Sequence, residues 1–207
     1  MSSDSVASLE LRQLAVLMIL TLTVGVRLVA HRLAGGLLRD QSDGLRAEGG
    51  LIPAILLRLA FLLFGLGGFV LFLVQPERLP GSIELPGWTH FLGGVLAELG
   101  LLLLIAVHLS LGVQFSGTLH LRSDHRLISA GPYASMRHPM YTSFLLLFVG
   151  LSLLIGSWMV GAILLGSQVW VLGWRLPREE HQLAERFGSE WETYKASTGA
   201  LIPRLRR

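Results

Sequence analysis

The sequence contains no cysteine and few charged residues. Only 15% of its 207 residues are Asp, Glu, Lys or Arg, whereas 52% are hydrophobic. A soluble domain normally has about 25% charged residues, so this chain has too few to cover itself in water. The absence of cysteine excludes disulfides, zinc–thiolate sites and a thiol nucleophile. An integral membrane protein is the class that fits.

An excess of acidic residues is also absent: the formal net charge is +3. A basic chain raises the possibility of nucleic-acid binding, which needs Lys and Arg clustered on one polar face. Here the basic residues lie at the ends of apolar segments instead. That distribution is typical of membrane topology, and it argues against nucleic acid as a partner.

Long apolar segments make up most of the chain. A spanning helix needs about 20 apolar residues. Three such segments cover residues 11–33, 51–74 and 88–113, and a fourth covers residues 141–174. Gly156-Ser157 interrupts the fourth, which predicts a tight hairpin of helices at 141–155 and 158–174. The predicted fold is an all-α integral membrane protein of about five transmembrane helices, the last two forming a short hairpin.

The carboxyl-terminal tail is predicted to form one further helix. Pro177 suits the first turn of a helix. Leu183, Phe187, Trp191 and Tyr194 then recur at helical spacing and form one apolar face. The sequence therefore predicts an amphipathic cytoplasmic helix lying against the bundle or the membrane surface.

Four ionisable residues fall within the apolar segments, where charge is costly and often functional. Arg27 and Arg58 lie near segment ends and are expected to reach the polar surface. For Glu98 and His108, the sequence leaves open both a structural role and a place in an internal cavity.

Residues 125–141 combine a turn, basic side chains and the start of the fourth apolar segment. Pro139 suits the first turn of a helix, whose free N–H groups and dipole can hold an anion. Arg137 and His138 add donors, and Tyr133 and Tyr141 add aromatic surface. The alternative is a basic flank with interfacial aromatic residues, serving topology alone.

A second polar cluster leaves the hairpin at the same membrane face. It consists of Arg175, Glu179 and Glu180, directly after the last apolar segment. Because the hairpin returns the chain to the depth at which it entered, the two clusters are expected to meet. A cation, carboxylates and an anion-binding helix end would suit a zwitterionic ligand with a nucleoside part.

Two ordered motifs carry a resemblance to a known family. GPY-x-x-x-RHPMY at residues 131–141 precedes the hairpin, and R-x-x-x-EE-x-x-L-x-x-x-FG-x-x-W-x-x-Y follows it from residue 175. This arrangement resembles the isoprenylcysteine carboxyl methyltransferase family. The resemblance implies membrane-embedded methyl transfer from S-adenosylmethionine to a lipophilic or prenylated acceptor that enters from the bilayer. It also implies that residues 1–94 supply amino-terminal helices and a cytoplasmic loop, and residues 95–207 a methyltransferase-like core, within one structural domain.

The same resemblance implies roles for individual residues. The cofactor would contact His125, Arg126, Leu127, Ile128, Tyr133, His138, Pro139, Met140, Tyr141 and Glu179. Arg175 would orient the acceptor. A carboxylate acceptor needs no general base, whereas an amine or thiol needs one, for which Glu180 or His181 is the candidate. Eukaryotic members of the family have a glutamine at the position of Thr118. The resemblance therefore assigns no side-chain role to Thr118.

Two other classes share part of this pattern. Membrane sterol and steroid reductases have a similar RH-x-x-Y and hairpin arrangement but bind NADPH. The paired glutamates and the FG-x-x-W-x-x-Y tail favour the methyltransferase. A non-catalytic membrane scaffold would leave the converging polar clusters unexplained.

The distribution of Lys and Arg predicts the topology. Thirteen of them lie in the loops and tail on one side of the predicted bundle and two, Arg12 and Arg78, on the other. Loops rich in Lys and Arg stay in the cytoplasm, so the carboxyl terminus and the polar clusters should face the cytoplasm.

This topology predicts which introduced cysteines can be labelled. A cysteine introduced at Ser197 should react only with a reagent that enters the cytoplasm of intact cells. One at Ser82 should react from outside, and the reverse pattern would contradict this topology.

Overall fold

The computed structural model describes residues 3–33, 63, 65–112 and 127–204. Every regular element in this part of the chain is a helix. The α-helices are α1 (Ser3–Leu33), α4 (Gly87–Leu111), α5 (Pro139–Ile155), α6 (Trp158–Trp170), α7 (Leu176–Phe187) and α8 (Ser189–Ser197), with a further short helix at Gly65–Val74. Short 3-10 turns lie at η1 (Pro76–Arg78) and η3 (Gly131–Ala134), and a π-helical segment, η4, covers Val171–Arg175.

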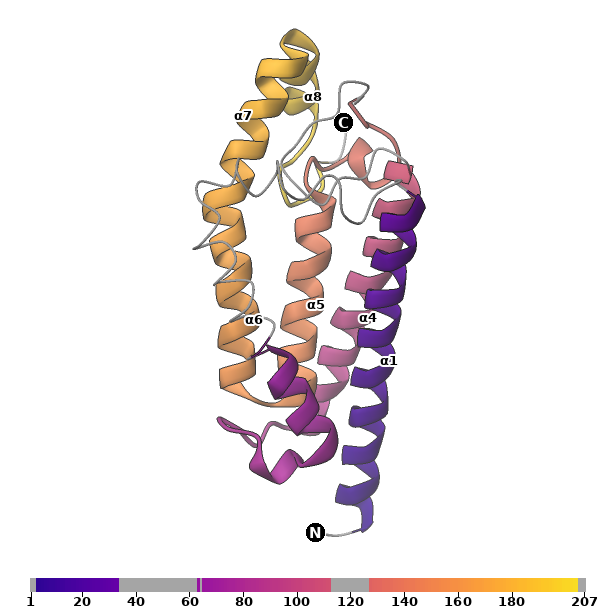
Figure 1. The fold of residues 1–207 in the computed structure, drawn as a ribbon, viewed down its shortest axis with the longest axis vertical. Helices are drawn as coiled ribbons and strands as arrows, with labels where there is room; N and C mark the ends of the chain where they lie inside the picture. The colour runs from indigo at the N-terminus through magenta and orange to yellow at the C-terminus, as the bar shows by residue number, and fades with distance from the viewer. Residues whose placement is uncertain (1–2, 34–62, 64, 113–126, 205–207) are drawn as a thin grey trace.

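The long helices form one elongated bundle. Helices α1, α4, α5 and α6 run along the long axis, with α5 packed between α4 and α6 and with α1 against α4 and α5 (Figure 1). Helices α7 and α8 lie at the end that carries the carboxyl terminus, opposite the amino terminus (Figure 1). We call this the α7–α8 end.

Membrane insertion is supported by helix length and by what the helices expose. Within the described residues, three helices are long and apolar enough to cross a bilayer: Ala7–Leu33, Gly87–Leu111 and Trp158–Phe187. α5 is shorter, at 17 residues. Large apolar side chains such as Leu11, Val29, Phe91 and Leu109 are exposed, as expected of surfaces that face lipid. The second predicted helix lies partly outside the described residues, so the number of crossings stays a prediction.

The predicted hairpin is confirmed between α5 and α6. Gly156 adopts φ +72°, a left-handed conformation that glycine allows, and its N–H donates to Ser152 to close α5. Ser157 then caps α6, because its hydroxyl accepts from the backbone N–H of Val160. The same hydroxyl donates to the carbonyl of Pro80, 2.8 Å away, so the connection after η1 is fastened to the hairpin turn.

The prediction that the last membrane helix ends at Trp174 is wrong. The helix runs without interruption from Trp158 to Phe187, through η4. Pro177 has no N–H for the carbonyl four residues earlier, and the wider turn of η4 lies just where an α-helix would require that bond. Thirty residues span roughly 45 Å, more than the hydrocarbon core of about 30 Å. The charged residues 175–187 therefore extend beyond the membrane-spanning part.

The prediction of a single tail helix is also wrong. Gly188 adopts φ +50° and ends α7, and α8 begins at the next residue. Because α8 is redirected there, Trp191 and Tyr194 become buried, with 1% and 8% of their surfaces exposed. The apolar residues expected on one helix face are thus divided between two helices.

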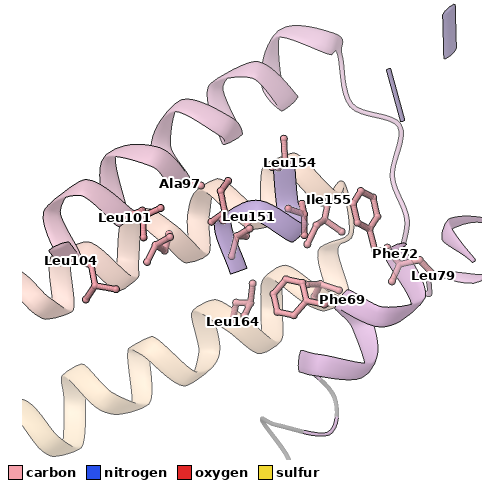
Figure 2. Packing of buried hydrophobic residues seen from close by; sticks show 14 residues of the cluster. Phe69, Phe72, Leu79, Ala97, Leu101, Leu104, Leu151, Leu154, Ile155 and Leu164 are labelled. Atoms are coloured by element: carbon pink, nitrogen blue, oxygen red, sulfur yellow. The ribbon is translucent and has the colours of Figure 1, made fainter. Parts of the chain in front are cut away.

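Glycines set the contact between α4 and α5, and an apolar core continues from it. A side chain at Gly150 would place its Cβ 2.4 Å from the backbone nitrogen of Ala97, and one at Gly93 would lie 2.7 Å from the carbonyl oxygen of Gly150. Small residues of this kind let membrane helices approach closely. Beside them, buried side chains from α4, α5, α6 and the helix Gly65–Val74 point into one interior (Figure 2).

This close approach predicts the effect of adding one methyl group. Gly150→Ala should destabilise the bundle by about 1–3 kcal/mol, because the new Cβ meets backbone atoms that cannot move aside. Gly166→Ala is the matched control, since its Cβ would meet nothing within 4 Å. Thermal unfolding in detergent measures both. Equal melting temperatures for the two variants would contradict the proposed packing.

Candidate active site at the α7–α8 end

The start of α5 is tied to α7 through one carboxylate. His138, only 4% exposed, lies with its Nε2 3.1 Å from Glu180 Oε1, and the Nε of Arg137 donates to the same oxygen over 3.1 Å. Lys195 of α8 lies 3.5 Å from the other carboxylate oxygen. The bond from His138, then Arg137, lowers the pKa of Glu180 to about 2. This group therefore stays ionised and is a weak base.

The carboxyl-terminal segment completes the same assembly. Arg137 donates from NH1 to the carbonyls of Thr198, at 2.6 Å, and Lys195, at 3.1 Å. The backbone N–H groups of Arg137 and His138 donate to Gly199 and Ala200. These two N–H groups lie just before the first turn of α5, and the segment after α8 folds back alongside them.

A second set of contacts joins Tyr141 to the α6–α7 helix. Its hydroxyl donates to Glu179 Oε2, and the side chain of Arg175 is also hydrogen-bonded to it. The ring of Tyr141 stacks on that of His138, with centroids 5.7 Å apart and planes at 25°. The two polar clusters predicted from the sequence therefore meet in the structure.

Tyr133 lies beside this set. Burial and the negative charge of Glu179 raise the pKa of its hydroxyl, so it remains a neutral donor. Its backbone carbonyl accepts from the hydroxyl of Tyr194, 2.8 Å away, which holds η3 against α8. Burial raises the pKa of Tyr194 to about 12.

The other predicted cofactor residues are placed as follows. Leu127 and Ile128 are partly buried just before η3, Pro139 is fully buried at the start of α5, and Met140 is partly buried against the core. His125, Arg126 and Thr118 lie outside the described residues. The alternative base His181 is exposed on α7 and pairs with Glu185 at 3.2 Å.

The sequence left open whether Glu98 and His108 have a structural role or a place in an internal cavity. Glu98 is exposed on α4, so it is not an internal residue, whereas His108 is buried, with 8% exposed. Gln168, which the sequence analysis did not single out, is 4% exposed and donates to the carbonyl of Tyr141 over 2.9 Å. A polar amide within an apolar helix was the signal that could have found it.

Parts of this chain are similar to known proteins. A family model described as phospholipid methyltransferase matches residues 88–190, about half of the chain. Protein-S-isoprenylcysteine O-methyltransferase B of Arabidopsis thaliana is 29% identical over 119 residues, covering 56% of this chain and 60% of that protein. The corresponding enzyme of Schizosaccharomyces pombe is 33% identical over 81 residues, 39% of this chain and 34% of that protein.

A solved structure shows the same fold. The eukaryotic intramembrane Ras methyltransferase, an isoprenylcysteine carboxyl methyltransferase solved without a monobody, superposes with a TM-score of 0.50 and 23% identity. The superposition covers 80% of this chain and 54% of that one. The sequence relatives and this fold agree. The chain is similar in sequence to protein-S-isoprenylcysteine O-methyltransferases and shares the fold of the solved structure.

The match to the family model covers only part of the chain. This chain spans about 60% of the length of the Arabidopsis relative and 54% of the solved structure. The matched residues 88–190 include η3, α5 and the α6–α7 helix, which hold the two polar clusters. Helix α1 and the carboxyl-terminal segment lie outside the matched range.

Proposed function

We propose that this protein is an S-adenosylmethionine-dependent methyltransferase that methylates the carboxylate of an isoprenylcysteine-like, lipophilic acceptor. The observation that carries the proposal is the meeting of Tyr141, Glu179 and Arg175 at the α7–α8 end. It joins a carboxylate, a neutral hydroxyl and a guanidinium at the boundary between apolar helices and a polar cap. The names of the family's relatives support the reaction class.

The residues present fit the cofactor that this family implies. Glu179 offers a carboxylate for a positively charged or hydroxyl group, and the stacked rings of His138 and Tyr141 offer a flat aromatic surface. Tyr133 adds a further aromatic ring, whose hydroxyl lies within range of the Glu179 charge. S-adenosylmethionine, when bound, supplies an electrophilic methyl group. The proposed binding set is the predicted one, with His125 and Arg126 outside the described residues.

The acceptor is proposed to be a carboxylate because Arg175 offers a planar fork of donors and Glu180 is a weak base. A carboxylate is already a nucleophile, so the protein needs only to align it and exclude water. Arg175 can hold one of its oxygens while the other faces the methyl group. An amine acceptor would need a general base. Glu180 is ill suited to that task, because Arg137, His138 and Lys195 surround it and its pKa is about 2.

Glu180 is therefore proposed as a positioning residue. It fixes Arg137 and His138 relative to α7, and through them it sets the direction in which α5 presents Tyr141. The alternative reductase function gains no support from the relatives, which are methyltransferases. The cytoplasmic location of this end remains part of the proposal and follows from the distribution of Lys and Arg.

The cofactor assignment predicts the effect of neutralising Glu179. Glu179→Gln should weaken binding of S-adenosylhomocysteine by at least about 1 kcal/mol, the scale of one hydrogen bond to a charged group. Calorimetry of the purified protein measures this, with Glu185→Gln, a change to an exposed carboxylate on the same helix, as the matched control. An unchanged affinity would place the cofactor elsewhere. Binding of NADP in place of S-adenosylhomocysteine would favour a reductase.

The acceptor assignment predicts that Arg175 acts through its shape as well as its charge. Lysine keeps the charge but cannot form two parallel bonds to a carboxylate. Arg175→Lys should retain expression and S-adenosylhomocysteine affinity, while methyl transfer falls at least about tenfold, or about 1.4 kcal/mol of transition-state stabilisation. Transfer of a tritiated methyl group to a farnesylcysteine analogue provides the assay. If the lysine variant transferred methyl groups at the wild-type rate, the role of Arg175 would be limited to anchoring the helix at the membrane interface.

A further inference from the structure

Two tryptophans and an arginine form a stack on the α6–α7 helix. The rings of Trp170 and Trp174, one turn apart, have centres separated by 5.3 Å and planes at 12°. The Cζ of Arg178, one turn further on, lies over the ring of Trp174, 3.8 Å from its centre. Its NH1 also donates to the backbone carbonyl of Trp174 over 2.7 Å. We call these three residues the Trp–Trp–Arg stack.

The stack lies on the outside of the bundle. α6 packs against α5, and the α6–α7 helix runs along one side of the bundle (Figure 1). Trp170 is 40% exposed, and Val169 beside it is 69% exposed. Arg178 is exposed as well, whereas its neighbour Glu179 is bonded to Tyr141. The same helix therefore presents one set of residues to the candidate site and another to the surroundings of the bundle.

Helix length places the stack at the edge of the membrane. No residue between Trp158, where α6 begins, and Trp174 is charged. At a rise of about 1.5 Å per residue, Arg178 lies roughly 30 Å from Trp158, which matches the thickness of the hydrocarbon core. Tryptophan rings are enriched at the level of the lipid headgroups. Arg178 therefore lies at the depth of the lipid phosphates on the side of the α7–α8 end.

The contacts of Arg178 hold its guanidinium in place and leave donors for an anion. A guanidinium has five N–H donors in a planar fork. Among the described residues, its hydrogen-bond partner is the carbonyl of Trp174, which takes one of them. Glu185, seven residues further on and on the same side of the helix, pairs with His181 at 3.2 Å. A guanidinium fixed in this way suits a phosphate, which it can bind by two parallel hydrogen bonds.

We propose that the Trp–Trp–Arg stack binds one anionic phospholipid. Arg178 holds the headgroup phosphate, and the rings of Trp170 and Trp174 lie beside the first part of the acyl chains. Charge selects the headgroup: an anionic headgroup complements Arg178, whereas a headgroup that carries an ammonium brings a second cation toward it. This inference goes beyond the proposed methyl transfer and does not depend on it.

The test uses the tryptophans of the stack as reporters. The protein in detergent is titrated with phosphatidylglycerol brominated on its acyl chains, which quenches the fluorescence of tryptophans that the chains contact. Arg178→Gln keeps every tryptophan and should weaken binding about tenfold, as expected when a hydrogen bond between charged groups is lost. Brominated phosphatidylcholine should bind the wild type more weakly than phosphatidylglycerol does.

Arg186→Gln is the matched control. It removes the same charge from an exposed arginine of the same helix, about 12 Å further from the membrane. Its affinity for phosphatidylglycerol should equal that of the wild type. Equal losses in Arg178→Gln and Arg186→Gln would replace the proposed site by a diffuse attraction between the basic helix and the lipid.

Three other outcomes would overturn the proposal. Wild-type affinity in Arg178→Gln would mean that Arg178 does not hold the headgroup, and equal binding of the two lipids would mean that the site does not select anionic charge. Displacement of the lipid by inorganic phosphate would indicate a site for free phosphate. If Arg178→Gln does not fold, Arg178→Lys, which keeps the charge but not the fork, should show a smaller loss. Wild-type affinity in the lysine variant would then contradict the role of the fork.

Discussion

The Glu180 carboxylate is the contact on which the α7–α8 end depends. One of its oxygens accepts from Arg137 and His138, and the other faces Lys195, so a single side chain holds the start of α5, α7 and α8 together. Arg137 extends the same connection to the carbonyls that follow α8. Removing one partner from a partly buried network of this kind leaves the others uncompensated, which costs more than the bond itself contributes. The direction of Tyr141, and with it the candidate site, follows from this contact.

Two features of the bundle bring the parts of this network to the same depth. The glycine contacts between α4 and α5 allow the two helices to run closely side by side, which fixes where α5 begins. The π-helical segment η4 lets the last membrane helix continue past Pro177, so Arg175, Glu179 and Glu180 leave the membrane on a rigid helix and not on a loop. A site built on helices holds its groups more precisely than one built on loops. This rigidity suits a reaction whose catalysis depends on alignment.

The fold also explains how a chain without cysteine and with few charges can hold a polar site. Its charged side chains are concentrated where apolar helices end, and there they are paired with one another and with backbone carbonyls. Arg137, Glu180 and Lys195 are satisfied in this way. Arg178 does the same nearby, stacked over Trp174 and bonded to its carbonyl. Charge that would be costly inside the membrane is therefore gathered at one end, next to the residues assigned to catalysis.

The sequence by itself determined the class of protein and the order of the site motifs. Apolar segment length predicted the membrane helices, Gly156-Ser157 predicted the hairpin, and the motifs around His138 and Glu179 predicted that two clusters would meet, because these signals are local. The sequence did not indicate that Gly188 would break the tail helix, or that the carbonyls of Gly199 and Ala200 would accept from the backbone N–H groups of Arg137 and His138, just before α5. These contacts join residues that are distant in the chain, and only helix packing decides which side chains share one region of space.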